Sequence, residues 1–97
     1  MADTLLIIDD EENMRHMLGS MLQRAGYMVE KAADGRQALT LLRTNAFDFI
    51  LCDIKMPEMD GMEFLRLSSD LRGNSTVIMM SAYGTIDLAV EAMRLGA

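Results

Sequence analysis

The sequence predicts an α/β fold in which one parallel β-sheet is covered by helices on both faces. Short apolar runs that suit strands alternate with segments that have the helical period of apolar residues. Turn residues separate these segments, and no repeat, low-complexity tract or linker interrupts the alternation. Such an alternation is typical of parallel sheets with right-handed crossovers, and 97 residues suffice for one small domain.

The first half of the chain is predicted to form two strand–helix units. In order, they are a strand over Thr4–Asp9, a helix over Glu12–Ala25 followed by Gly26, a half-polar strand over Tyr27–Ala32, and a helix from Asp34-Gly35 to about Thr44. The half-polar strand suits the edge of a sheet. One face of the first helix carries Met14, Met17, Leu18, Met21, Leu22 and Ala25, and we expect these side chains to fill the core.

The second half is predicted to contain two further units. They are a strand over Phe47–Asp53, a helix from Gly61 to about Ser69, a loop over Leu71–Ser75, a strand over Thr76–Ser81, and a helix from the cap residue Thr85 to about Leu95. The strand over Phe47–Asp53 is mostly apolar, yet it ends on a carboxylate. A buried strand is not expected to end on a carboxylate unless that carboxylate has a role, and the predicted strand order indicates where it lies.

The first and third strands are the most continuously apolar, so we expect them to be central and adjacent. That expectation predicts the strand order 2-1-3-4, the flavodoxin-like (CheY-like) doubly wound arrangement. Such sheets bind ligands outside the carboxyl ends of their strands, where the first and third strands diverge. In this sequence those ends carry Asp9, Asp10 and Asp53.

Composition excludes several functional classes. The net charge is −6 and no stripe of Lys or Arg follows a helix, so we expect no direct contact with nucleic acid. No apolar run approaches the ~20 residues of a membrane span, and the N-terminus lacks a basic signal-peptide region. The lone cysteine, Cys52, cannot form an internal disulfide, which fits a reducing, cytoplasmic compartment, and we expect it to be a small core residue.

Three carboxylates at one sheet edge indicate a site for a hard cation. Like charges so close together are unfavourable unless a cation takes their oxygens, and Mg²⁺ prefers oxygen ligands. Asp is also a known nucleophile that forms aspartyl-phosphate, and Asp53 at the tip of a central strand is placed for that role. Ser81, at the end of the neighbouring strand, could donate a hydrogen bond to a phosphoryl oxygen, and the small Ala82 leaves the site open.

The segments LLIIDDEENMR, FDFILCDIKMPEMDGMEFL and VIMMSAYG together resemble the receiver domain of bacterial two-component response regulators. The resemblance implies that Asp9 and Asp10 bind Mg²⁺. It also implies that Asp53 accepts a phosphoryl group from a sensor histidine kinase, and that the main-chain carbonyl of Lys55 completes the metal site. Ser81 would then be the switch hydroxyl.

The same resemblance extends to function and partners. The positions of Lys55, Ala82 and Tyr83 would flank the phosphoryl group and tune its lifetime. Residues 81–97 resemble receivers of NtrC-like transcription activators, which implies an output domain outside this chain and a role in transcription regulation. A receiver is not an enzyme with an external substrate, because it takes part only in its own phosphorylation and dephosphorylation.

The chain departs from the receiver pattern at its end. Receivers have five β-α units, and the fifth strand carries a lysine, whereas this chain has four units and no lysine after Lys55. We therefore expect residues 1–97 to be a receiver domain that is incomplete at its C-terminus. The strand over Thr76–Ser81 would then be an open edge, which favours a dimer or a swapped assembly.

Alternative interpretations remain open. Asp9 and Asp10 also suit helix capping and surface charge, and Ser81 could cap the following helix. A pseudo-receiver would keep the fold as an interaction module without regulated phosphorylation. A flavodoxin-like binder of nucleotide or flavin is disfavoured, because the acidic, glycine-free loop DDEEN would repel phosphate without a metal.

Overall fold

The computed structural model describes residues 3–53, 59–73 and 75–80. Its elements are β1 (Thr4–Ile8), α1 (Glu12–Arg24), β2 (Met28–Ala32), α2 (Gly35–Thr44), β3 (Phe49–Asp53), α3 (Gly61–Leu67) and β4 (Thr76–Met80). Each element lies within its predicted range, and the ends differ by two residues at most. The predicted helix from Thr85 to Leu95 lies outside the described residues. Among the described helices, none combines the length and apolar character that a membrane crossing needs.

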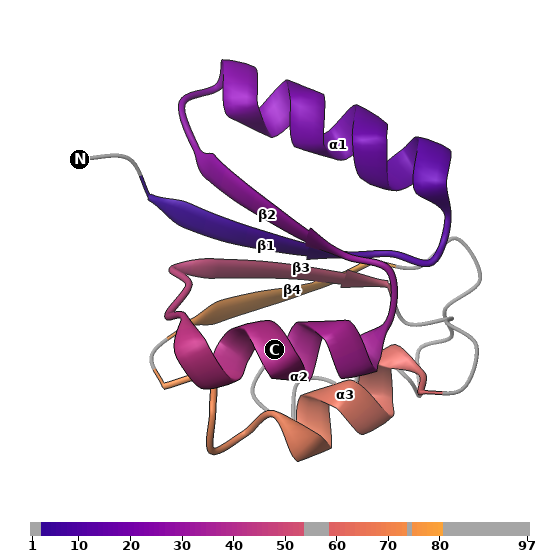
Figure 1. The fold of residues 1–97 in the computed structure, drawn as a ribbon, viewed down its shortest axis with the longest axis vertical. Helices are drawn as coiled ribbons and strands as arrows, with labels where there is room; N and C mark the ends of the chain where they lie inside the picture. Colours follow the sequence, from indigo (N-terminus) through magenta and orange to yellow (C-terminus); the bar gives the residue numbers. More distant parts are fainter. Residues whose placement is uncertain (1–2, 54–58, 74, 81–97) are drawn as a thin grey trace.

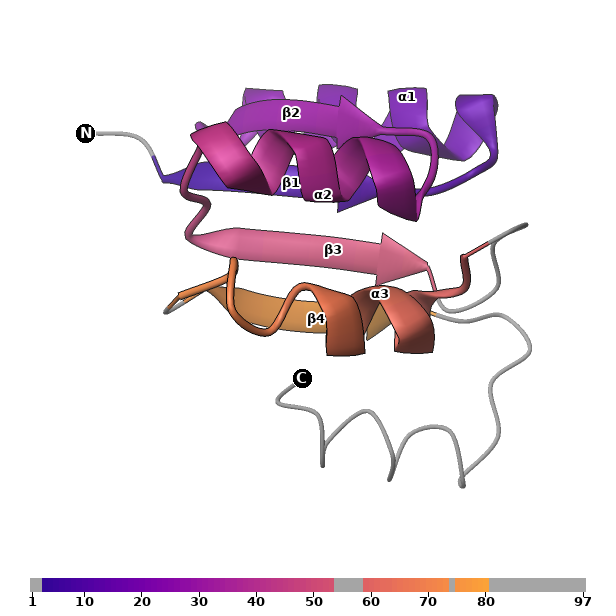
Figure 2. The ribbon, with the colours of Figure 1, turned by 60° about the horizontal axis from the view of Figure 1, so that its bottom comes forward.

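The sheet has the predicted order β2-β1-β3-β4, and all its neighbouring strands are parallel. The register pairs Ile8 with Cys52 and Asp53 with Met80, so the carboxyl ends of β1, β3 and β4 lie along one edge of the sheet. Figures 1 and 2 show α1 on one face, and α2 and α3 on the other. This is the doubly wound arrangement that the sequence predicts.

The main core lies between the sheet and the α2–α3 layer. In β3 the burial alternates, because Ile50 and Cys52 point into this layer. The remaining core members come from every described element except α1; they are Leu6, Ile8, Ala32, Ala38, Leu42, Phe47, Met62, Phe64, Leu65 and Val77. β2 is half-polar and largely exposed, as expected for an edge strand.

The methionine face of α1 is not core, so the prediction that it fills the interior is wrong. Met14, Met17 and Met21 are 38%, 48% and 58% exposed. α1 packs over β1 and β2, and among its residues only Gly19 is buried. On this face of the sheet the described residues place no helix over β4, where Ile78 is also exposed. The contact of α1 with β1 and β2 therefore leaves these methionines largely uncovered.

Backbone features set the packing distance and the ends of the helices. A Cβ at Gly19 would lie 2.8 Å from Cε of Lys31, so this glycine lets α1 approach β2 across the lysine stem. Gly26 follows α1 with a φ of +103°, the left-handed conformation that favours glycine after a helix.

Asp34 and Asp60 cap α2 and α3, because their carboxylates accept hydrogen bonds from the main-chain N–H groups of Gln37 and Glu63. The Asp60 cap fixes the start of α3 just beyond the segment that follows Asp53.

β4 is an edge of the sheet among the described strands. Its outward residues Thr76 and Ile78 are exposed, and Val77 is buried against the core. An edge strand presents unpaired main-chain groups that favour pairing with another strand. Pairing of two copies through this edge stays a prediction.

Candidate metal and phosphoacceptor site

Three carboxylates gather where β1 and β3 end. Asp9 and Asp10 directly follow β1, and Asp53 is the last residue of β3. Parallel pairing of Ile8 with Cys52 places the two ends side by side. One carboxylate oxygen from each of the three residues lies within 4.8 Å of the others. The sequence-based expectation that these side chains converge is thus met by the geometry.

The three acids differ in their exposure. Asp9 is 6% exposed, Asp53 is half-buried and Asp10 is exposed to solvent. The cluster is therefore open on the side of Asp10 and closed on the side of Asp9. A ligand or a phosphodonor could approach from the open side, while the inner carboxylate is held by the fold.

Asp9 is held at three points by neighbouring elements. Its main-chain N–H donates to the carbonyl of Ala32 at 3.2 Å, at the end of β2. Its Oδ1 accepts from the main-chain N–H of Glu11 at 2.9 Å, and its own carbonyl accepts from Nη1 of Arg15 at 2.8 Å. Within the described part of the chain, Oδ2 of Asp9 accepts no hydrogen bond, so this oxygen is available to a cation.

The pKa of the Cys52 thiol depends on its burial and on the acids around it. Burial, and then the negative charges of Asp53, Asp60 and Asp9, raise the pKa of its thiol to about 12. The thiol donates to the carbonyl of Asp53 at 3.4 Å and is fully buried, as expected for a core cysteine. Burial is the larger cause of this shift, and the negative charges that add to it also attract a cation to the strand ends.

The cluster suits a hard divalent cation. Octahedral Mg²⁺ with ligands at about 2.1 Å places neighbouring ligand oxygens about 3 Å apart and opposite ones about 4.2 Å apart. The three ligand oxygens of the cluster lie within 4.8 Å of one another, a limit slightly above the larger of these separations. Asp9, Asp10 and Asp53 could therefore share one Mg²⁺ after small side-chain movements, and the exposed side leaves room for water or phosphate oxygens.

The buried thiol gives a testable consequence. We expect Cys52 of the folded protein to resist alkylation by iodoacetamide at pH 8, because the thiolate is scarce and the sulfur is inaccessible. Mass spectrometry should find the thiol unmodified in buffer and fully modified in concentrated urea, which serves as the control. Rapid labelling of the folded protein would contradict the burial of Cys52.

The structure places only some of the predicted site residues. Lys55, Ser81, Ala82 and Tyr83 lie outside the described residues. Sequence reasoning missed Arg15, whose guanidinium reaches the main chain of Asp9. The available signal was a charged residue three positions before Leu18 and seven before Leu22, on the side of the helix that those leucines share.

Comparisons with known proteins agree with this geometry. Residues 5–97 match the response regulator receiver domain family. The chain is 41% identical over 93 residues to the transcriptional regulatory protein ZraR of Klebsiella oxytoca, which covers 96% of the chain and 21% of ZraR. It is 38% identical over 97 residues to the sporulation initiation phosphotransferase F of Bacillus subtilis, which covers 100% of the chain and 78% of that protein.

Solved structures show the same fold. The chemotaxis protein CheY4 of Vibrio cholerae superposes with a TM-score of 0.93 at 33% identity, covering 100% of this chain and 82% of that one. A response regulator from Burkholderia pseudomallei, solved with a phosphorylated aspartic acid, a calcium ion and citrate, has a TM-score of 0.93 at 30% identity, covering 98% and 56%. The chain spans about a fifth of the length of ZraR. With its flavodoxin-like sheet and a family match over residues 5–97, the chain belongs to the response regulator receiver domains of two-component systems.

Proposed function

We propose that this chain is a phosphorylation-dependent signalling switch, in which Asp53 accepts a phosphoryl group with the help of Mg²⁺. The observation that carries the proposal is the convergence of Asp9, Asp10 and Asp53 at the carboxyl ends of β1 and β3. Asp53 is half-buried at the tip of a central strand, so its carboxylate is partly open to a donor. Asp9 and Asp10 would hold the metal beside it.

The chemistry follows from the position of the nucleophile. An oxygen of Asp53 attacks the phosphorus of a phosphohistidine, the P–N bond breaks, and the imidazole nitrogen keeps the electron pair. Mg²⁺, when bound, neutralises charge on the transferring group and lets an anionic carboxylate approach it. The hold on Asp9 keeps the inner ligand in place throughout. The product is an aspartyl-phosphate, and no external substrate is turned over.

Residues outside the described part of the chain complete the proposal. We assign the main-chain carbonyl of Lys55 to the metal site and the hydroxyl of Ser81 to recognition of the phosphoryl group. Ala82 and Tyr83 would tune how long the aspartyl-phosphate survives. These roles rest on the match to the family over residues 5–97.

The proposed partners are a sensor histidine kinase as donor and an output domain as effector. ZraR is a transcriptional regulatory protein several times longer than this chain, and AtoC of Escherichia coli, 42% identical over 93 residues, is a regulatory protein of similar proportions. This likeness supports control of transcription through an output domain, in the cytoplasm. The sporulation phosphotransferase instead has a length close to that of a receiver alone, which supports a relay as a second form of output.

A small phosphodonor tests the proposal directly. Acetyl phosphate with Mg²⁺ should add one phosphoryl group to the wild type, and intact-mass spectrometry should detect none on Asp53→Asn or after chelation with EDTA. Fluoroberyllate, a phosphoryl mimic, should likewise shift the amide NMR spectrum of the wild type but not that of Asp53→Asn. Asp70→Asn, which removes an exposed acid beyond α3, is the matched control and should behave as the wild type.

The outcomes separate the competing functions. Equal phosphorylation of the wild type and Asp53→Asn would contradict the assignment of the phosphoacceptor. A folded wild type that takes up neither phosphoryl group nor fluoroberyllate would favour the pseudo-receiver, an interaction module without regulated phosphorylation.

A further inference from the structure

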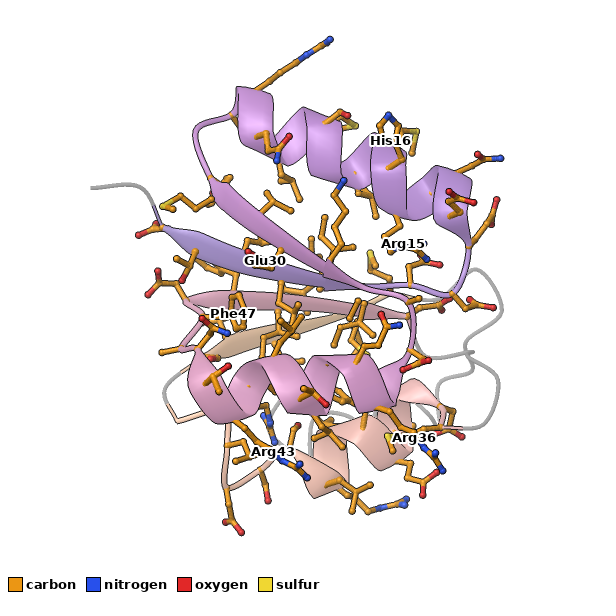
Figure 3. All side chains as sticks on the ribbon, in the orientation of Figure 1. Arg15, His16, Glu30, Arg36, Arg43 and Phe47 are labelled. Atoms are coloured by element: carbon orange, nitrogen blue, oxygen red, sulfur yellow. The ribbon has the colours of Figure 1, made fainter. Side chains whose placement is uncertain are left out.

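Arg15 is a charged residue of α1 that reaches the candidate metal site without belonging to the acid cluster. Figure 3 shows it on the sheet-facing side of α1, whereas the neighbouring His16 lies on the side turned away from the sheet. Its Nη1 donates to the main-chain carbonyl of Asp9 at 2.8 Å. Arg15 is half-buried, while His16 is exposed. A half-buried guanidinium needs such an acceptor, and here the acceptor is the backbone of a proposed metal ligand.

The hydrogen bond from Arg15 completes the support of Asp9. Without it, two contacts remain, one from the N–H of Asp9 to Ala32 and one from the N–H of Glu11 to Oδ1. The turn closed by the N–H of Glu11 and Oδ1 of Asp9 spans the peptide that joins Asp9 to Asp10, but neither contact engages the carbonyl of that peptide. Rotation of that peptide would change the direction of the Asp10 main chain, and with it the separation of the two carboxylates. The guanidinium therefore adds a direct restraint on the carbonyl of the peptide between the two acids.

We propose that Arg15 is a positioning residue for the divalent-cation site, acting through the Asp9–Asp10 peptide rather than by touching the ion. The inference rests on the proposed function, since the ion is the Mg²⁺ of that proposal. Supporting groups behind metal ligands commonly change affinity by 10- to 100-fold. Arg15 supports a ligand through its backbone, so a smaller effect of about five- to tenfold is expected.

The positive charge of Arg15 acts in the opposite direction, because it repels a cation. The acids at this edge of the sheet are the three carboxylates of the cluster, with Glu11 and Glu12 beside them in sequence, and a second cation, Lys31, lies against Gly19 one helical turn along α1. These acids outnumber the guanidinium, and the cluster is open to water on the side of Asp10, where solvent screens the repulsion. Loss of the hydrogen bond should therefore outweigh relief of the repulsion, and the two effects predict opposite changes in affinity.

The test is a Mg²⁺ titration of the wild type, Arg15→Met, Arg15→Lys and Arg24→Met, followed by amide NMR shifts with the metal alone. Arg24 lies in the exposed last turn of α1 and is the matched control. We expect Arg15→Met to bind Mg²⁺ about five- to tenfold more weakly and Arg24→Met to bind it as the wild type does. Arg15→Lys, which keeps a donor and the charge, should recover about half of the lost affinity on a logarithmic scale and so bind Mg²⁺ about two- to threefold more weakly than the wild type.

Each outcome is decisive. Affinity of Arg15→Met equal to or tighter than that of the wild type would overturn the positioning role, while the Mg²⁺ site itself would stand. Absence of Mg²⁺ binding by the wild type would instead refute the proposed function. If Arg15→Met does not fold, Arg15→Lys is the test variant. A shift of the Glu11 amide signal before metal is added, together with two- to threefold weaker Mg²⁺ binding, supports the proposal. A Mg²⁺ titration identical to that of the wild type overturns it.

Discussion

Mg²⁺ at one hundred times its dissociation constant is expected to raise the free energy of unfolding by about 2.7 kcal/mol, because the folded chain binds the ion and the unfolded chain does not. For a domain of this size the melting temperature should rise by more than about 10 °C. Only the fold brings Asp9, Asp10 and Asp53 within 4.8 Å of one another. Circular dichroism melts in MgCl₂ measure the gain, with KCl of equal ionic strength as the control for screening.

Asp10→Asn separates the metal effect from charge screening. This variant removes the exposed carboxylate, so the core is untouched. Without Mg²⁺ it should be at least as stable as the wild type, since two like charges remain where there were three. With Mg²⁺, the increase in its free energy of unfolding should be at most half of the increase seen for the wild type. A full gain in Asp10→Asn, equal to that of Asp70→Asn, would contradict a site built on Asp10.

Phe64→Ala is expected to lower the free energy of unfolding by about 3–5 kcal/mol, the range for truncating a large buried aromatic side chain. Among the described residues, Phe64 is the largest fully buried side chain, and it lies in the layer between α3 and the sheet. Domains of this kind have free energies of unfolding of about 5–15 kcal/mol, so this substitution would remove a large fraction of the stability. Urea unfolding followed by circular dichroism measures the change.

Leu67→Ala provides the matched control in the same helix. Leu67 is 53% exposed, so its truncation should cost less than about 1 kcal/mol. Comparable losses for the two variants would contradict the core described for the α2–α3 layer. Mg²⁺ should partly restore the stability of Phe64→Ala, because this substitution leaves the acid cluster in place.

The architecture could be predicted because the apolar continuity of each strand indicates its place in the sheet. β1 and β3 are continuously apolar, which predicts two central neighbours, and β2 is half-polar, which predicts an edge. Parallel order then brings the carboxyl ends of β1 and β3 together. The convergence of Asp9, Asp10 and Asp53 follows from topology, so it needed no knowledge of side-chain packing.

The methionine face of α1 shows that the spacing of apolar residues does not predict which helix face is buried. Helical spacing identifies Met14, Met17 and Met21 as one face, yet it carries no information about which neighbour lies against that face. α1 rests on β1 and β2 through the side that carries Arg15 and Gly19, and the methionines flank this contact. Their exposure depends on where the helix sits over the sheet.

The sequence by itself determined the order of the elements, the strand order and the carboxylates that meet at the strand ends, because these follow from period, apolar continuity and chain direction. Only the tertiary structure decided which face of α1 is covered, how far burial and nearby acids raise the pKa of Cys52, and that Arg15 holds the backbone of Asp9. Those properties depend on distances between atoms far apart in the chain, and such distances exist only once the helices have packed against the sheet.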